Sequence, residues 1–224
     1  MKQILLSILF FKIALSFNPA HGSQFSGDQI IIVLDPTGDA QHTGRIIEDS
    51  FERSITLKLA ELIKKDLENE NIKVRLTRFA GETLEPYQNI SFANRLNADL
   101  FINLNLFQDS KQINEIYIYN LMYNKVSDLW PKKFDDLFIC PLEDAYLTSI
   151  NKSIQYSTLF AQYLSSFPTK SFTIFGPYAI PFKPLVGLKQ PGFAIEIGIN
   201  EKDNITNLVQ PISNAIKHLI QKLS

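Results

Sequence analysis

Apolar residues along this 224-residue chain follow two patterns, which are short continuous runs and longer stretches with apolar residues every three or four positions. The short runs are rich in β-branched residues and end at turn formers, as buried strands do. The longer stretches place their apolar residues on one side of a helix. The predicted strands are 29–35, 73–77, 99–105, 115–120, 185–188 and 193–199, and the predicted helices are 50–70, 86–96, 149–166 and 204–223. This alternation predicts a single α/β domain with a mainly parallel six-stranded sheet and helices on both faces.

The first 22 residues have the order of a secretory signal peptide. Lys2 is followed by an apolar run and then by small residues suited to cleavage. The alternative is an N-terminal membrane anchor, although Lys12 interrupts the run. Cleavage would leave a linker, 23–28, and the domain at 29–224. We therefore expect an exported protein of the periplasm or cell envelope, with no stable membrane span after cleavage.

Charge and cysteine content exclude several classes of function. The chain has 22 basic and 23 acidic residues, a net charge of −1, so it lacks the basic surface of a nucleic-acid-binding protein. Its one cysteine, Cys140, excludes a disulfide or a cysteine metal cluster within one chain. Cys140 lies in the segment 123–146, whose prolines and aromatic residues indicate an irregular insertion.

Six blocks of sequence resemble the zinc-dependent N-acetylmuramoyl-L-alanine amidases, the family called amidase type 3. The blocks are LDPTGDAQHTGR at 34–45, Glu52 with its apolar helix, KVRLTR at 73–78, FANRLNADLFINLNLF at 92–107, EIYIYN at 115–120 and PGFAIEIGINEKDN at 191–204. They occur in the family's order and extend over most of the predicted domain. The first block follows a predicted strand, where α/β proteins commonly place functional loops.

The resemblance implies hydrolysis of the amide between N-acetylmuramic acid and L-alanine. In that family two histidines and a glutamate hold zinc, which lowers the pKa of a bound water, and a second glutamate transfers protons. The match places Glu52 at the glutamate ligand position and Glu196 at the acid/base position. The two histidine positions fall on Gly38 and Asn105.

The loss of both histidines changes the expected function. Glycine offers no donor and an asparagine oxygen suits zinc poorly. We therefore expect no cofactor and no catalysis, but an exported amidase-like protein that binds peptidoglycan fragments or a cell-wall enzyme. The alternative is an active zinc amidase in which His42 joins Glu52 as a substitute ligand. A structural envelope domain is a third possibility. Replacing Gly38 and Asn105 with histidine is expected to raise the zinc content.

The two glutamates each have a structural interpretation beside the functional one. Glu52 is either a surviving ligand or a helix N-terminal acid that the helix dipole favours. Glu196 lies in an apolar strand, so its carboxylate should face a cleft or pair with Arg45 or a lysine.

Asp39, Asn103 and Asn105 are the candidate ligand-binding residues. Asn103 and Asn105 are two positions apart, so they share one face of their strand. Their amides could hydrogen-bond a sugar or peptide, or could satisfy one another and the loop backbone. His42 could rebuild a site with Asp39 and the glutamates, or could lie exposed on its loop.

Overall fold

The computed structural model describes residues 29–85, 87–111, 114–122, 133–134, 137–138, 142–167 and 172–223. The expected signal peptide and linker lie outside these residues, as do Cys140 and much of the predicted insertion 123–146. Within the described part of the chain, no helix combines the length and apolar character that crossing a membrane requires.

Six strands form one sheet in the order β4-β1-β5-β10-β6-β9. They are β1 (Ile30–Pro36), β4 (Ile72–Leu76), β5 (Leu100–Gln108), β6 (Asn114–Leu121), β9 (Phe172–Ile180) and β10 (Gly192–Ile199). Every neighbouring pair is parallel except β10 and β6. The predicted α/β fold with a mainly parallel six-stranded sheet is therefore confirmed. The short strands form two further pairs, β2 (Ile46–Ile47) with β3 (Ser50–Phe51) and β7 (Lys133–Phe134) with β8 (Leu137–Phe138).

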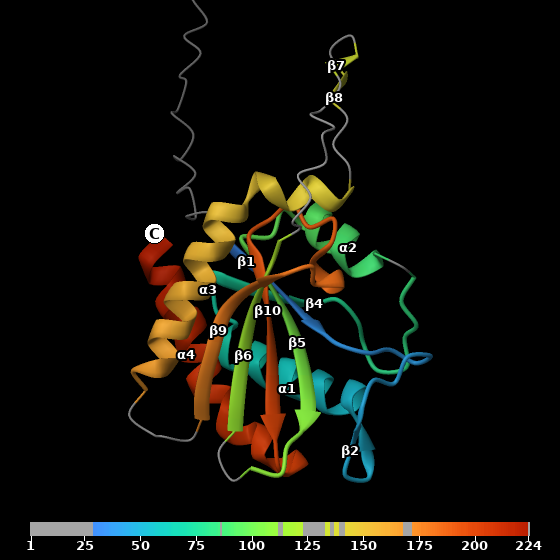
Figure 1. Ribbon diagram of the computed structural model, residues 1–224, viewed down its shortest axis with the longest axis vertical. Helices are drawn as coiled ribbons and strands as arrows, with labels where there is room; N and C mark the ends of the chain where they lie inside the picture. Colours follow the sequence, from blue (N-terminus) through green and yellow to red (C-terminus); the bar gives the residue numbers. More distant parts are fainter. Residues whose placement is uncertain are drawn as a thin grey trace, which may run out of the picture.

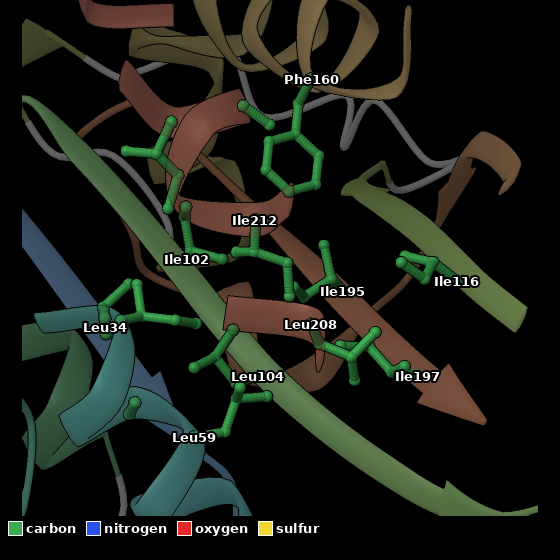
Figure 2. Packing of buried hydrophobic residues seen from close by; sticks show 14 of the residues in the cluster. Leu34, Leu59, Ile102, Leu104, Ile116, Phe160, Ile195, Ile197, Leu208 and Ile212 are labelled. Carbon is green, nitrogen blue, oxygen red and sulfur yellow. The ribbon is translucent and has the colours of Figure 1, made fainter. Parts of the chain in front are cut away.

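Helices cover both faces of the sheet, as the sequence predicts. One face packs against α1 (Glu52–Leu67), α3 (Ile150–Ser165) and α4 (Ile205–Leu223), and Figure 1 shows α1 and α4 behind the strands. In Figure 2, isoleucines and leucines of β5 and β10 meet Leu208 and Ile212 of α4 in this core. The other face carries α2 (Gln88–Leu96) and the 3-10 helix η2 (Lys183–Leu185). The remaining 3-10 helices are η1 (Leu142–Thr148) and η3 (Lys202–Asn204).

Three local predictions are wrong. Residues 185–188 form no strand, because η2 and a turn at Gly187 (φ +87°) place this apolar run in the core beneath α2. The sixth strand is instead β9, an edge strand whose Gly176-Pro177 pair suggests a turn in the sequence; the missing proline N–H is tolerated at an edge. The helix predicted from residue 50 begins instead at Glu52, because Ser50 belongs to β3 and Phe51 holds the N-cap position.

The sheet face that carries α2 changes from apolar to polar along its strands. Val33 and Phe101 pack beneath α2, whereas Asp35 and Asn103 follow two positions later on the same strands and are paired in register. On the neighbouring strand β10, Glu196 is in register with Asn105 of β5. Side chains two positions apart on a strand share a face, so these polar groups gather at the carboxyl ends of the central strands.

Candidate functional site

Asp35 is the buried centre of a polar network at the end of β1. Its side chain is 3% exposed and accepts hydrogen bonds from Thr77 Oγ1 (2.6 Å), Asn89 Nδ2 (2.9 Å) and Asn103 Nδ2 (2.8 Å). Burial raises the pKa of Asp35, and the hydrogen bonds from Thr77 and Asn103 offset part of that rise. Asp35 therefore connects β1 to β5, to α2 and to the residue that follows β4, and these bonds fix the buried side of the candidate site.

Asn103 and Asn105 extend this network along β5. The Asn105 Nδ2 donates to Asn103 Oδ1 (2.6 Å) and to the Ile195 carbonyl oxygen (3.3 Å), while Asn105 Oδ1 accepts from Thr37 Oγ1 (2.5 Å). The two amides share one strand face, as predicted, and they hydrogen-bond each other. The amide of Asn105, which the resemblance places at the second histidine position, is therefore hydrogen-bonded within the protein.

Glu52 is the first residue of α1 and is 3% exposed. One carboxylate oxygen accepts the backbone N–H of Leu106 (2.9 Å) and the other accepts the backbone N–H of Arg45 (3.0 Å). A Cβ atom built at Gly44 would lie 2.8 Å from the carboxylate oxygen that accepts from Arg45. Only glycine at position 44 therefore leaves space for the Glu52 carboxylate. Glu52 therefore links the end of β5 to the loop before β2.

Gly38, which the resemblance places at the first histidine position, has a conformation that suits glycine. Its φ is +81°, a region that other L-residues rarely adopt. A Cβ atom there would lie 2.7 Å from the Cβ of Arg53 and 2.9 Å from the carbonyl oxygen of His42. Position 38 therefore supplies no metal-ligand atom and has no space for a side chain that would supply one.

Asp39 shapes the loop that follows Gly38. Its carboxylate accepts the backbone N–H groups of Gln41 (2.8 Å), His42 (2.7 Å) and Leu84 (3.3 Å). Burial alone would raise the pKa of Asp39, but the hydrogen bonds from the His42 backbone and ring, with those from Leu84 and Gln41, lower it to about 2. The His42 ring lies 3.2 Å from this carboxylate, and its side chain is 77% exposed.

Glu196 is partly buried, with its side chain 19% exposed, and is held by two groups. Its Oε1 lies 2.6 Å from Arg45 Nη2, and its Oε2 accepts from the Tyr119 hydroxyl (3.0 Å). Arg45 also donates to the Leu106 carbonyl oxygen and lies over the Phe107 ring. Burial, with a further contribution from the Glu196 charge, raises the pKa of Tyr119 to about 12. The pairing with Arg45 is one of the arrangements expected from the sequence.

These contacts do not fit a three-ligand zinc centre. Gly38 supplies no donor, Asn105 is bonded to Asn103 and Thr37, and both oxygens of Glu52 accept backbone N–H groups. Across the residues that the structure describes, no three His, Cys, Asp or Glu side chains lie together as a metal-binding group. His42 lies beside Asp39, and it does not form a group of three potential metal ligands with Glu52 or with Glu196.

Sequence reasoning missed three residues that complete this site. Asp35 is the centre of the network, Thr37 bonds Asn105, and Tyr119 bonds Glu196. An aspartate at the end of a buried apolar strand was the signal for Asp35. The alternation of tyrosines with isoleucines in EIYIYN placed Tyr119 on a sheet face, but the partner strand that brings Glu196 beside it comes 77 residues later.

Residues 32–217 match the N-acetylmuramoyl-L-alanine amidase family, and the chain belongs to this family. Over 81 residues it is 36% identical to the N-acetylmuramoyl-L-alanine amidase AmiA of Escherichia coli, a match that covers 35% of this chain and 28% of AmiA. The chain thus matches well under a third of that curated relative.

Solved amidase structures share the fold. The catalytic domain of CwlV, an N-acetylmuramoyl-L-alanine amidase from Bacillus (Paenibacillus) polymyxa, is 16% identical with a TM-score of 0.59, and the match covers 86% of this chain and 99% of that domain. The CwlD amidase from Clostridioides difficile, solved in complex with the GerS lipoprotein, is 16% identical with a TM-score of 0.50, covering 87% and 98% of the two chains.

Proposed function

We propose that this chain is an exported, zinc-free member of the amidase family that binds peptidoglycan fragments or a cell-wall protein partner without hydrolysing the muramoyl–alanine amide. The observation that carries the proposal is the packing at Gly38, where the position of the first histidine ligand is closed by Arg53 and by a positive φ. The bonds of Asn105 and Glu52 support it, because a metal would have to displace several buried hydrogen bonds.

The partly exposed pair of Arg45 and Glu196 supports retention of a binding role. Glu196 and Arg45 place an anionic and a cationic group together, with Phe107 and Tyr119 beside them. Stem peptides carry ammonium and carboxylate groups that could exchange partners with such a pair, and aromatic rings offer faces for sugars. A protein partner is the second source of such groups, and the CwlD structure contains a lipoprotein partner.

Metal content and hydrolysis test the zinc-free part of the proposal. The purified domain is incubated with Zn²⁺, dialysed, and measured by plasma mass spectrometry, and muropeptide digests are analysed by liquid chromatography. We expect well under one zinc per chain and no release of stem peptide. One bound zinc per chain with cleavage would favour the active amidase in which His42 substitutes for a lost ligand.

Cosedimentation with purified sacculi tests the binding part. The Glu196→Gln variant should bind about ten- to a hundredfold more weakly if the carboxylate bonds a cationic group of the ligand. Glu201→Gln, an exposed change of equal charge just beyond β10, is the matched control and should bind like the wild type. If the wild type does not bind sacculi, the ligand would be a protein partner and not peptidoglycan. Capture of a partner from an envelope extract with the same two variants would test that alternative.

N-terminal sequencing of the protein from an envelope fraction tests export. We expect the mature chain to begin near residue 23, because the charged, apolar and small-residue segments have the order of a signal peptide. An intact Met1 would instead favour the membrane anchor.

A further inference from the structure

A pocket of about 530 Å³ lies on the flank of α1, and its lining includes neither Arg45 nor Glu196. Its volume is within the range of pockets that hold small molecules. Five of its lining residues are ionisable, three of them basic and two acidic: Arg53, Lys58, Arg78, Asp39 and Glu61. The rest of the lining includes the apolar side chains of Leu57, Ala40 and Ala80. The pocket therefore combines cationic groups with an aliphatic wall.

Arg78 is a buried cation that lines this pocket. The residue is 3% exposed, its Nε donates to the Pro36 carbonyl oxygen (3.0 Å), and its Nη2 donates to the carbonyl oxygens of Thr37 (3.0 Å) and Arg53 (2.7 Å). Among the described residues its Nη1 has no hydrogen-bond partner. Backbone carbonyls thus fix the guanidinium and leave one of its nitrogens available.

Arg53 and Lys58 add two further cations from α1. Arg53 uses Nη1 for the carbonyl oxygens of Asp39 (2.9 Å) and Ala40 (2.8 Å), while its Nε and Nη2 make no hydrogen bond to described residues. Lys58 is exposed and makes no ion pair within the described part of the chain. Burial is the largest cause of the lowered pKa of Arg78; the Asp35 and Asp39 charges raise this pKa, and repulsion from the Arg53 charge lowers it by a smaller amount. An anion between the two guanidiniums would relieve that repulsion.

The two acidic residues of the pocket differ in how they are held. The Asp39 carboxylate accepts hydrogen bonds from three backbone N–H groups and lies 3.2 Å from the His42 ring nitrogen. Its oxygens are therefore engaged by the backbone and by His42. Glu61 is exposed and makes no ion pair with a described residue. With both carboxylates counted, the pocket carries a net charge of +1, from three basic and two acidic side chains.

We propose that this pocket binds the carboxylate of a small aliphatic acid or of a peptide C terminus. A net charge of +1 complements a singly charged carboxylate better than doubly charged phosphate, and guanidinium forks match carboxylate geometry. The side chain of Leu57 and the two alanines suit a methyl or similar group next to the carboxylate. The pocket shares Asp39 and Arg53 with the candidate functional site, but the proposed binding needs neither zinc nor the Arg45–Glu196 pair.

Titration of the labelled protein with N-acetylalanine, followed by NMR, tests this site. The matched probe is N-acetylalanine amide, which has the same shape without the charge, and inorganic phosphate is the second comparison. We expect the carboxylate to shift backbone signals of residues 53–61 and 78–81, with weaker effects at higher salt, and the amide to shift none of them. Equal shifts with the amide, or shifts with phosphate alone, would overturn the carboxylate assignment.

Charge variants on α1 sharpen the test without touching the backbone bonds of Arg78. Lys58→Gln should weaken binding of N-acetylalanine about three- to fivefold, and Glu61→Gln should strengthen that binding by a similar factor. Each variant changes the pocket charge by one at an exposed position. Lys65→Gln, an exposed change of equal charge outside the pocket lining, is the control and should have no effect. Equal weakening by Lys58→Gln and Lys65→Gln would reduce the result to general charge attraction and overturn the pocket.

Discussion

Gly38 lies so close to Arg53 that a Cβ atom built on the glycine would be 2.7 Å from the Arg53 Cβ. From the sequence alone, restoring histidine at positions 38 and 105 should raise the zinc content, with Glu52 as the third ligand. The packing at Gly38 reverses that expectation. A side chain at φ +81° costs about 1–3 kcal/mol before the contact with Arg53 is counted.

We therefore expect the Gly38→His/Asn105→His variant to unfold at a lower temperature and to hold little more zinc than the wild type. Gly38→Ala carries both the positive-φ cost and the contact of the added Cβ with Arg53, so it should account for most of the loss of stability, whereas Asn105→His alone should be the milder change. Thermal unfolding with and without Zn²⁺, together with metal analysis, measures both effects. A double variant with one zinc per chain and an unchanged melting temperature would show that the loop opens readily.

Glu52 is expected to stabilise the metal-free protein. Glu52→Ala removes the acceptor of the Leu106 and Arg45 backbone N–H groups, which should lower the free energy of unfolding by about 2–4 kcal/mol. Glu52→Gln keeps one acceptor and should lose roughly half as much. Urea unfolding in the presence of EDTA measures the change, with the exposed Glu61→Ala on the same helix as the control. A stable Glu52→Ala protein would mean that the residue serves a ligand and not the fold.

The fold followed from local patterns, whereas the site depended on contacts that no local pattern contains. Strand β1 and helix α4 could be predicted because their apolar spacing matches one element over its whole length. Strand β9 was missed because its Gly-Pro pair resembles a turn, and only its position at the sheet edge makes it a strand.

At the site, the sequence predicted Glu52 near the start of a helix and Glu196 within an apolar strand, and the structure has Glu52 as the first residue of α1 and Glu196 in β10. The sequence could not show that the Glu52 oxygens bond backbone N–H groups, because Leu106 is 54 positions away. It also could not show the positive φ of Gly38, because glycine is compatible with either sign of φ. The resemblance to the amidases named the candidate residues, and the geometry shows how Gly38, Asn105 and Glu52 are packed and hydrogen-bonded.

Acid stability should depend on Asp39. Burial opposes ionisation of this carboxyl, yet the hydrogen bonds from His42, Leu84 and Gln41 lower its pKa to about 2, below its usual value of 3.8. A lowered native pKa contributes stability that is complete above pH 4 and is lost as the pH falls from about 4 to 2. Asp39→Asn should therefore be less stable at neutral pH and lose less between pH 4 and pH 2. Urea unfolding at each pH measures the change. An equal loss of stability between pH 4 and pH 2 in the wild type and in Asp39→Asn would contradict the lowered pKa of Asp39.

Tyr119 gives the corresponding test at high pH. Burial, followed by the charge and hydrogen bond of Glu196, raises its pKa from about 10 to about 12 in the native protein. The unfolded protein has the lower pKa and so releases the proton first. The resulting stabilisation is therefore complete below pH 10 and disappears as the pH rises from 10 to 12. Tyr119→Phe should be less sensitive to pH in this range.

The contribution of Glu196 can be separated from that of burial by following the Tyr119 ring carbon by NMR against pH. Glu196→Gln removes the negative charge 3.0 Å from the Tyr119 hydroxyl, so the pKa of Tyr119 should fall. It should remain above 10, because burial is the larger cause and persists in the variant. Glu201→Gln, an exposed change of equal charge just beyond β10, should leave the pKa at about 12. If Glu196→Gln also leaves it there, the carboxylate does not lie beside Tyr119 in solution, and the proposed role of the Arg45–Glu196 pair in ligand binding would lose its geometric basis.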